Sequence, residues 1–530
     1  MLSHFIKRFQ MLFQQIKGQE HETPVESQQK NSIPIKKSYQ KNLEDIKNAL
    51  DTNFDLVIRE FNVQGHENRK AFIAYLSKIV NEEKINDNIV KPLMEPMERY
   101  ESLQNLDLSY IKNSILPTVN VEQVSDLNQI IENIVNGETA LFYMNYGEAL
   151  SIDSWEVKGR DIEKPETETV VRGPKESFNE SLSENTALLR RKIKNPDLKL
   201  ESFTLGNQTK TEVIVAYMED IADENIVNEV KSRLSEIDID AILESGYVEE
   251  FLEDAPYSPF PTVGNTEKPD KLAADLLDGR IGLMFDGTPI ALYVPYLFVE
   301  TFMTSEDYYT RYSYASFLRG IRIIALLVTV MLPGFYVSVV SFHPELIPKE
   351  LAVSIAVASE GVPFPTFLEI LFFGVIFEIL REAGIRMPSN VGQAVSIVGA
   401  LILGEAAIQA GIVGAPVVIV TALTAISGFA VPTQLDALTM LRIPFVFASA
   451  IMGLPGLLTA FNFIIIYLCS LRSFSVPYFS PVAPLSLSGL KDFMVRVPWW
   501  LMFKRPKLIS EKNKKRQPFG QRPKPEQNND

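Results

Sequence analysis

The chain has almost none of the residues from which disulfide frameworks and metal sites are built. It contains one cysteine, Cys469, which lies inside an apolar run. The four histidines are far apart in the sequence and show no HxxxH or HxxE spacing: His4, His21, His66 and His343. A single cysteine excludes an internal disulfide and a cysteine-based metal site. We therefore expect no metal and no cofactor.

Catalytic and nucleotide-binding motifs are also missing. The glycine clusters fit neither the GxxxxGK[ST] nor the GxGxxG spacing that holds phosphates. The sequence offers no set of serine, histidine and aspartate, or of cysteine and histidine, for nucleophilic catalysis. The formal net charge of −15 argues against a nucleic-acid partner. These absences predict a protein that is not an enzyme.

The mean hydropathy of +0.04 hides two different halves. Residues 1–320 are acid-rich and read as soluble, whereas residues 321–471 are dominated by apolar runs. Residues 1–17 contain no apolar run longer than three residues, so they do not read as a signal peptide, and we expect the soluble half to be cytoplasmic. Their helical spacing of apolar residues fits a helix on an anionic membrane surface, or equally one packed on its own domain.

The soluble half shows mixed helix and strand signals after a polar linker that ends near residue 37. We expect helices over 42–50, 125–137, 178–194 and 225–237, and strands over 69–76, 139–153 (a pair broken at Asn145–Gly147) and 211–219. Residues 280–295 predict a β-hairpin that turns at Asp286-Gly287. The predicted architecture is therefore an N-terminal segment and linker, 1–37, followed by two mixed α/β subdomains, 38–165 and 166–320.

The apolar half predicts an all-α, multi-pass membrane domain over 321–471, with about four or five apolar helices. The segments that could cross are 323–342, 364–380, 394–410, 417–431 and 443–470, whereas 351–359 is too short and is placed at the interface. Helix kinks are expected at Pro333, Gly334, Pro455 and Gly456, where neighbouring helices can compensate the backbone.

The C-terminal tail, 472–530, is basic and sets the expected topology. Residues 504–524 carry nine Lys or Arg and one Glu, read as disordered, and by the positive-inside rule lie in the cytoplasm. Five crossings from a cytoplasmic domain would put the tail outside, so we expect an even number, four. Either the segment 364–383 lies flat or re-enters, or the closely joined pair 394–431 does so.

Four carboxylates stand in apolar surroundings: Glu369, Glu378, Glu382 and Glu405. An ionised carboxylate in hydrocarbon costs about 2.5 kcal/mol or more, so each needs a partner or a role. They could face water, a cation pathway or a subunit seam. Alternatively, Glu382 pairs with Arg381 or Arg386 and Glu369 caps an interfacial helix. The sequence leaves both interpretations open.

Four blocks resemble the A subunits of the nutrient germinant receptors of bacterial spores, the GerA family. They are "RGPKESFNESLSEN…RRK" within 171–198, "SPFPTVGNTEKPD…DGRIGLMFDGTP" within 258–295, "DYYTRYSYASFLRGIR" within 305–322, and "PFPTFLEILFFGVIFEILREAGIRMP…" within 363–411. The resemblance runs from about residue 40 to 507 in the expected order. It departs at Lys268, where the family usually has arginine, and at Ala400, where glycine is common.

The resemblance implies one subunit of a three-part receptor in the inner spore membrane, with cytoplasmic N-terminal domain and tail. The implied partners are a permease-like B subunit that holds a small nutrient germinant, a lipoprotein C subunit, the bilayer and further copies of the chain. It implies an oligomeric, ion-conducting or signal-transducing role in which the four carboxylates face a pore or a seam. We expect charged residues of the first block to join the soluble subdomains: Arg172, Glu176, Glu180, Arg190 and Arg191.

Two other classes of function remain. Broken helices permit a secondary transporter of a small solute, although the sequence shows no internal repeat. A non-conducting membrane scaffold for signalling is also compatible with the sequence. Substitution of Glu378 or Glu405 by Gln separates a channel from a scaffold.

Overall fold

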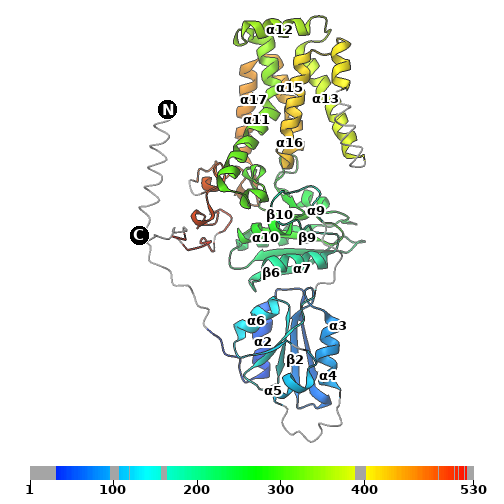
Figure 1. Ribbon diagram of the computed structural model, residues 1–530, viewed down its shortest axis with the longest axis vertical. Coiled ribbons are helices and arrows are strands. Elements are labelled where there is room, and N and C mark those ends of the chain that lie inside the picture. The colour runs from blue at the N-terminus through cyan, green and yellow to red at the C-terminus, as the bar shows by residue number, and fades with distance from the viewer. Residues whose placement is uncertain are drawn as a thin grey trace, which may run out of the picture. The chain divides into compact units, whose positions relative to one another are not determined.

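A computed structural model describes residues 32–95, 107–118, 120–156, 164–387, 402–486, 489–506, 508–510, 512–518 and 520–521 (Figure 1). The chain divides into two compact units. The first comprises 1–49, 57–75 and 82–154, and the second comprises 50–56, 76–81 and 155–530. The expected amphipathic segment 1–17 lies outside the described residues, as do 388–401, with Ala400 among them.

The first unit is built on a five-stranded sheet in the order β1-β2-β4-β5-β3. The strands are β1 (Leu56–Asn62), β2 (Lys70–Leu76), β3 (Val121–Val124), β4 (Glu138–Tyr143) and β5 (Ala149–Asp153). The helices are α2 (Tyr39–Leu50), α3 (Glu82–Ile85), α4 (Lys91–Met94), α5 (Leu108–Tyr110) and α6 (Leu127–Val135). Helix α6 packs on β3, β4 and β5, which gives the unit its mixed α/β character.

The second unit begins with another five-stranded sheet, in the order β6-β7-β9-β10-β8, whose neighbouring strands are all antiparallel. The strands are β6 (Leu198–Leu205), β7 (Thr211–Met218), β8 (Gly264–Thr266), β9 (Ile281–Phe285) and β10 (Ala291–Val294). Helices α7 (Leu182–Lys192) and α10 (Pro269–Leu277) pack on β9, while α8 (Glu224–Glu236) packs on α9 (Ser245–Leu252).

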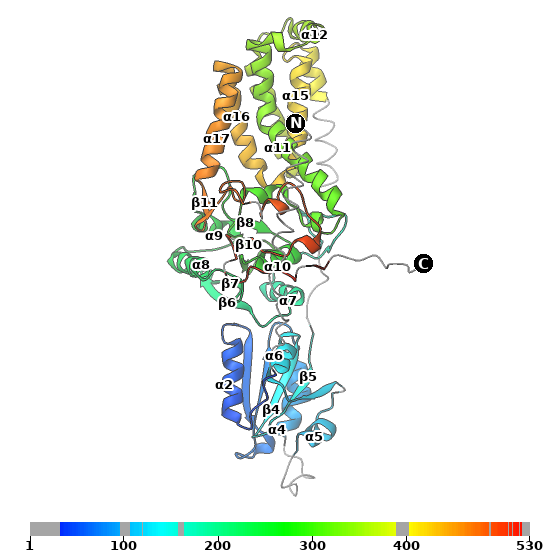
Figure 2. The ribbon, with the colours of Figure 1, turned by 90° about the vertical axis from the view of Figure 1, so that its left-hand side faces the viewer.

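A bundle of apolar helices follows in the second unit (Figure 2). Its helices are α11 (Tyr312–Phe342), α12 (Lys349–Ser359), α13 (Thr366–Ile385), a helical segment over 402–409, α15 (Ala415–Gly428), α16 (Leu435–Met452) and α17 (Leu454–Ser470). Among the described residues, Tyr312–Phe342 and Pro432–Met452 are long and apolar enough to cross a bilayer, while α15 and α17 are shorter apolar helices.

One hydrophobic core continues from the second sheet into the base of the bundle. Leu283 of β9 and Leu292 of β10 belong to the same buried cluster as Leu441 of α16 and Leu468 of α17. Phe493, from the C-terminal segment, joins this cluster as well. Burial of shared apolar surface resists separation of its parts, so the second sheet with its helices and the base of the bundle pack as one body.

Local signals in the soluble half are confirmed. The hairpin predicted over 280–295 is the antiparallel pair β9 and β10, and Gly287 in its turn has a φ of 90°. The helix expected over 225–237 is α8, and the strand expected over 211–219 is β7. These elements have a strong periodicity and a clear turn or cap at their ends, so neighbouring residues suffice to define them.

Two expectations about the C-terminal half are wrong. The stretch 443–470 is not one helix kinked at Pro455 and Gly456. It is the end of α16 and the whole of α17, an antiparallel pair that turns at Gly453, where a φ of 64° ends α16. Pro455 lies in the first turn of α17, where a proline removes no helical hydrogen bond. Helix α11, by contrast, runs continuously through Pro333 and Gly334.

The second correction concerns the basic tail, which was expected to be disordered. Ile509 and Ser510 are buried, and the tail pairs with acids of the α/β domain. Arg516 forms an ion pair with Asp278, and the Arg505 Nε donates to the Leu277 carbonyl at 2.8 Å. Charge complementarity with the acid-rich soluble half therefore orders this part of the tail.

Candidate functional site: charged groups in and below the helix bundle

Glu369, near the start of α13, holds the beginning of α15. Its carboxylate is 2% exposed, and Oε2 accepts a hydrogen bond of 2.8 Å from the backbone N–H of Gly414. Gly414 is the N-cap residue of α15. A carboxylate at a helix N-terminus satisfies an unpaired N–H and complements the positive end of the helix dipole. Glu369 is therefore a cap, supplied by one helix of the bundle to another.

Glu378 lies between two arginines. Its Oε1 accepts a hydrogen bond of 3.3 Å from Arg442 Nη1 on α16, and its Oε2 lies 3.0 Å from Arg381 Nη2, three residues along α13. The guanidinium of Arg442 is 11% exposed. Pairing of this kind is what a charged group within an apolar bundle requires.

Glu382 and Glu405 are more exposed than Glu369. Glu382 Oε1 lies 2.6 Å from Arg386 Nη2, in a surface pair at i,i+4, so one of the two pairings expected for it is present. Glu405 is exposed on the helical segment 402–409 and accepts a hydrogen bond of 3.1 Å from Gln409 Nε2. The exposed neighbours of Glu405 in this segment include Ile402, Leu403 and Ile408. Within the described residues, Glu378 and Glu382 have arginine partners, whereas Glu369 and Glu405 accept hydrogen bonds from neutral groups.

Only one of the residues expected to join the soluble subdomains forms a buried ion pair. Arg190 of α7 is fully buried and binds Asp55, with Nη2 2.7 Å from Oδ1, and it also donates to Asn53. Glu176 pairs with Arg191 and Lys192, which are close to it in sequence. The side chain of Arg172 is exposed, and its backbone N–H donates to Glu306. Glu180 contributes its backbone carbonyl to Gly287.

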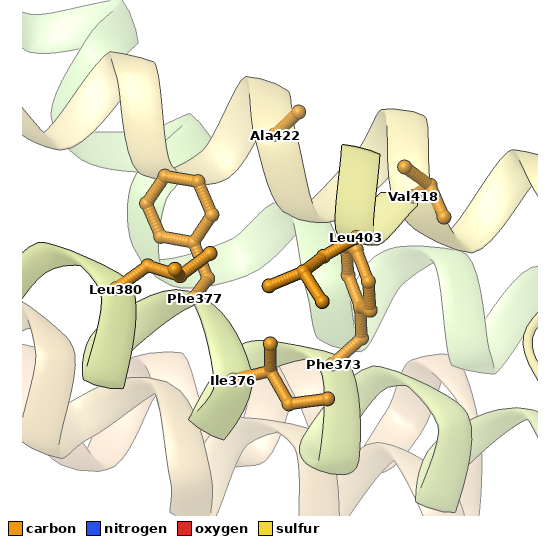
Figure 3. A pocket seen from close by; sticks show the side chains of 7 residues that line it. All are labelled: Phe373, Ile376, Phe377, Leu380, Leu403, Val418 and Ala422. Carbon is orange, nitrogen blue, oxygen red and sulfur yellow. The ribbon is translucent and has the colours of Figure 1, made fainter. Parts of the chain in front are cut away.

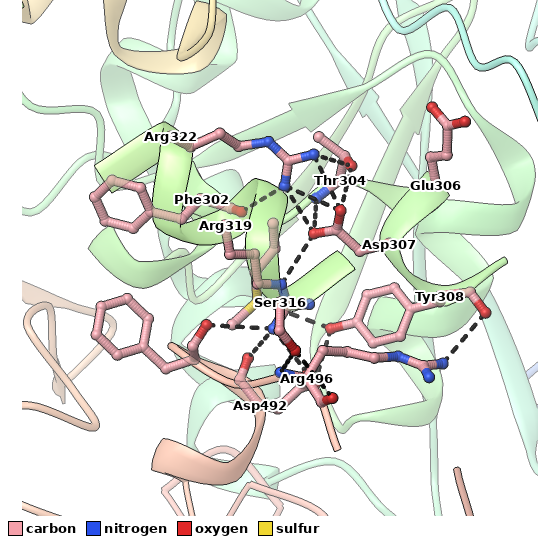
Figure 4. A network of polar contacts seen from close by, with 12 residues as sticks. Phe302, Thr304, Glu306, Asp307, Tyr308, Ser316, Arg319, Arg322, Asp492 and Arg496 are labelled. Atoms are coloured by element: carbon pink, nitrogen blue, oxygen red, sulfur yellow. Dashed lines mark hydrogen bonds and ion pairs between the residues drawn. The ribbon is translucent and has the colours of Figure 1, made fainter. Parts of the chain in front are cut away.

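A network that sequence reasoning missed lies where α11 leaves the α/β domain (Figure 4). Asp307 is buried and receives hydrogen bonds from Arg319 Nε at 3.0 Å and from Arg322 Nη1 at 2.8 Å. Arg319, fully buried in α11, also reaches Asp492 of the C-terminal segment, with Nη1 3.0 Å from Oδ1. Tyr308 donates its hydroxyl to Asp492 at 2.9 Å. The network therefore ties three parts of the chain to one point.

Burial and charge shift the pKa values of the network acids in opposite directions. Burial alone would raise the pKa of Asp307, but hydrogen bonds and charge from Arg322 and Arg319 outweigh it and hold the pKa below its usual value. Burial raises the pKa of Asp492, and Arg319 opposes this rise only in part. Of the two acids, Asp307 is therefore the one whose negatively charged form the fold favours.

A small apolar cavity lies between α13 and α15 (Figure 3). Its volume is about 40 Å³, and it is lined by Phe373, Ile376, Phe377, Leu380, Leu403, Val418 and Ala422. Pockets that enclose small organic ligands are typically about 300 Å³ or larger. This cavity is therefore a packing gap between helices, without room for a nutrient.

Comparison with known proteins identifies the family. The family model for the Bacillus/Clostridium GerA spore germination protein matches residues 44–508. The chain is 41% identical to spore germination protein KA of Bacillus subtilis (strain 168), over 94% of this chain and 92% of that protein. It is 39% identical to the uncharacterized membrane protein YfkQ of the same organism, over 94% of this chain and 96% of that protein.

A solved structure covers part of the chain. The N-terminal domain of the A subunit of the Bacillus megaterium spore germinant receptor GerK3 is 35% identical, covers 51% of this chain and 99% of that chain, and has a TM-score of 0.42. Members of this family are receptor subunits rather than enzymes. The chain belongs to the GerA family of spore germination proteins.

Proposed function

We propose that this chain is the membrane-embedded A subunit of a nutrient-sensing receptor that triggers spore germination. Its helix bundle lies in the inner spore membrane, and its α/β domain and tail are cytoplasmic. It works with a permease-like B subunit, which holds the nutrient, and with a lipoprotein C subunit. The family match and the names of the relatives support the germination role.

One observation carries the signalling part of the proposal: the α/β domain and the bundle share a core and a buried charge network. Leu441 and Leu468 of the bundle pack among residues of the second sheet, and Arg319 of α11 binds both Asp307 and Asp492. A displacement of α11 would therefore be transmitted to the α/β domain, because packed interfaces move as bodies.

The position of the C-terminal segment supports an even number of crossings. This segment returns to the base of the bundle, where Asp492 accepts a hydrogen bond from Tyr308 and Arg516 pairs with Asp278, so the chain enters and leaves the bundle on the same side. The nine basic residues of 504–524 favour the cytoplasm. Separation of α16 from α17 adds a pass that the sequence did not indicate.

Glu405 supports an oligomeric, ion-conducting arrangement. An exposed carboxylate on an apolar helix is unfavourable against lipid, and it is stabilised by water or by a second protein surface. We propose that this face of 402–409 lines a cation path or a seam between copies of the chain.

The test is the nutrient response of spores whose A subunit carries Glu405→Gln, with subunit levels in the spore membrane measured in parallel. We expect a slower response at normal subunit levels. Glu382→Gln is the matched control, because Glu382 is exposed and paired within its own helix. A Glu405→Gln response equal to that of the control, at normal levels, would favour the non-conducting scaffold.

A further inference from the structure

The charges around Glu378 do not balance. Arg381 and Arg442 both approach this single carboxylate, so the three side chains carry a formal charge of about +1 when ionised. Within the described residues, four buried atoms of this group have no hydrogen-bond partner: the Nε atoms of both arginines, the hydroxyl of Thr439 on α16 and the Oε2 of Glu378. Buried donors without an acceptor are unfavourable, so the site is incomplete as it stands.

Within the described residues, no acid other than Glu378 forms an ion pair with Arg381 or Arg442. Residues 388–401, which follow α13, contain no Asp or Glu. Glu382 is engaged by Arg386 at 2.6 Å, and Asp436 is exposed in the first turn of α16. The missing negative charge must therefore come from outside these segments.

The two arginines lie near the end of the bundle that meets the α/β domain. Leu441, the residue before Arg442, packs in the core that the bundle shares with the second sheet. Arg381 lies four residues before the end of α13. With the bundle in a bilayer, this is the level of the headgroups on the side of the α/β domain.

The surroundings of the arginines are apolar on the outside of the bundle. Ile379 and Ile385 of α13 and Ile443 of α16 are 63%, 72% and 50% exposed. A free anion would leave these side chains uncovered, whereas a lipid would cover them with its acyl chains. Guanidinium groups bind phosphate oxygens through paired, charge-assisted hydrogen bonds.

We propose that Arg381 and Arg442 bind the phosphate of an anionic lipid headgroup between α13 and α16. Glu378 offsets one of their two positive charges and competes with the phosphate for them, and Thr439 adds a hydroxyl donor. Basic pockets between membrane helices on the cytoplasmic side recognise such headgroups. The inference shares with the proposed function only the premise that the bundle lies in a bilayer.

The experiment is native mass spectrometry of the purified full-length protein, released from vesicles of equal phosphatidylglycerol and phosphatidylcholine. The wild type should retain phosphatidylglycerol preferentially. Arg381→Gln and Arg442→Gln should each lower that retention by about tenfold, as expected for loss of a charge-assisted hydrogen bond. The matched control is Arg386→Gln, on the same helix but in an exposed pair, and it should retain the lipid as the wild type does.

Glu378→Gln separates a lipid site from a structural ion pair. It breaks the same pair as Arg442→Gln but removes the competing carboxylate, so lipid retention should rise or stay unchanged. Equal losses in Glu378→Gln and Arg442→Gln would show that the pair only holds the helices together, and would overturn the proposal.

A second arm uses inorganic phosphate, titrated into the protein in neutral detergent. Arginine-dependent phosphate binding without selective lipid retention would assign the site to a soluble anion and overturn the lipid assignment. Absence of both would overturn the site itself. The nutrient response of Glu405→Gln spores does not depend on this result, so the two proposals fail separately.

Discussion

Replacement of Asp307 by Asn removes the negative charge that the buried Arg319 and the partly buried Arg322 share at the base of α11. The carboxylate accepts hydrogen bonds from Arg319 and Arg322 at 2.8 to 3.0 Å, and Arg319 would keep only Asp492 as an acidic partner. Removal of one partner from a buried ion pair costs about 3–5 kcal/mol. Because Asn retains the shape and one acceptor oxygen, we expect about 3 kcal/mol. This corresponds to a roughly hundredfold shift of the equilibrium toward the state in which the C-terminal segment is released from the network.

The assay is tryptophan emission during urea titration of the purified protein in detergent. The ring of Trp499 lies 5.8 Å from that of Tyr308, so its emission reports release of the C-terminal segment from the network. A Trp155→Phe background leaves only Trp499 and Trp500 as reporters. The control is Glu306→Gln: Glu306 accepts a backbone N–H of Arg172 at 3.3 Å, and its loss should change stability by less than about 0.5 kcal/mol.

The pH dependence gives the same prediction a second readout. Because the pKa of Asp307 is lowered in the folded protein, its stabilisation is present at neutral pH. It is lost as the pH falls below about 4, the ordinary value for Asp, toward the lowered pKa. Asp307→Asn should lack this acid-dependent loss. Equal midpoints for Asp307→Asn and Glu306→Gln at neutral pH would refute the reasoning.

Three further outcomes follow from the packing and the buried charges. Gly456→Ala places a methyl group against the backbone of α16 and should lower the thermal midpoint by an amount equivalent to about 1–3 kcal/mol, whereas Gly374→Ala, in open space, should be neutral or stabilising. Glu369→Ala removes the cap of α15 and should cost about 2 kcal/mol in a denaturant titration, against less than about 1 kcal/mol for Glu382→Ala, and equal losses would contradict the capping role. Burial, with smaller contributions from neighbouring acids, raises the pKa of Glu249 to about 7. The folded state therefore favours the proton, and stability should fall by at most about 3 kcal/mol as pH rises from about 4 to about 7. Glu249→Gln should flatten that profile, and an unchanged profile would assign it to other groups.

The predictable parts of the fold are those with local causes. The β9–β10 hairpin follows from alternating apolar residues around Asp286-Gly287, and α8 follows from its helical periodicity behind an Asp223 cap. The break was expected at Pro455-Gly456, whereas the turn that separates α16 from α17 is at Gly453. The sequence does not show which of the closely spaced Gly453, Pro455 and Gly456 ends the helix, because the positive φ of Gly453 is a property of the folded backbone.

The sequence identified the unusual carboxylates of the candidate site, but not the residues with which they pair. Apolar flanks identified Glu369 and Glu378 as unusual. However, the acceptor role of Glu369 depends on Gly414, 45 positions away, and Arg319 meets Asp492 across 173 positions. Such pairs are created by tertiary packing, and a single sequence offers no signal for them. The block at 305–322 contains Asp307 and Arg319, but nothing in the sequence connects it with Asp492.

The measurement that tests the central claim most directly is cation flux from liposomes that contain the purified full-length protein, with its oligomeric state determined by mass. The account predicts oligomers that leak cations, a leak that falls in Glu405→Gln, and no change in the Glu382→Gln control. Absence of flux from folded wild-type protein, or a leak that Glu405→Gln leaves unchanged, would contradict the account.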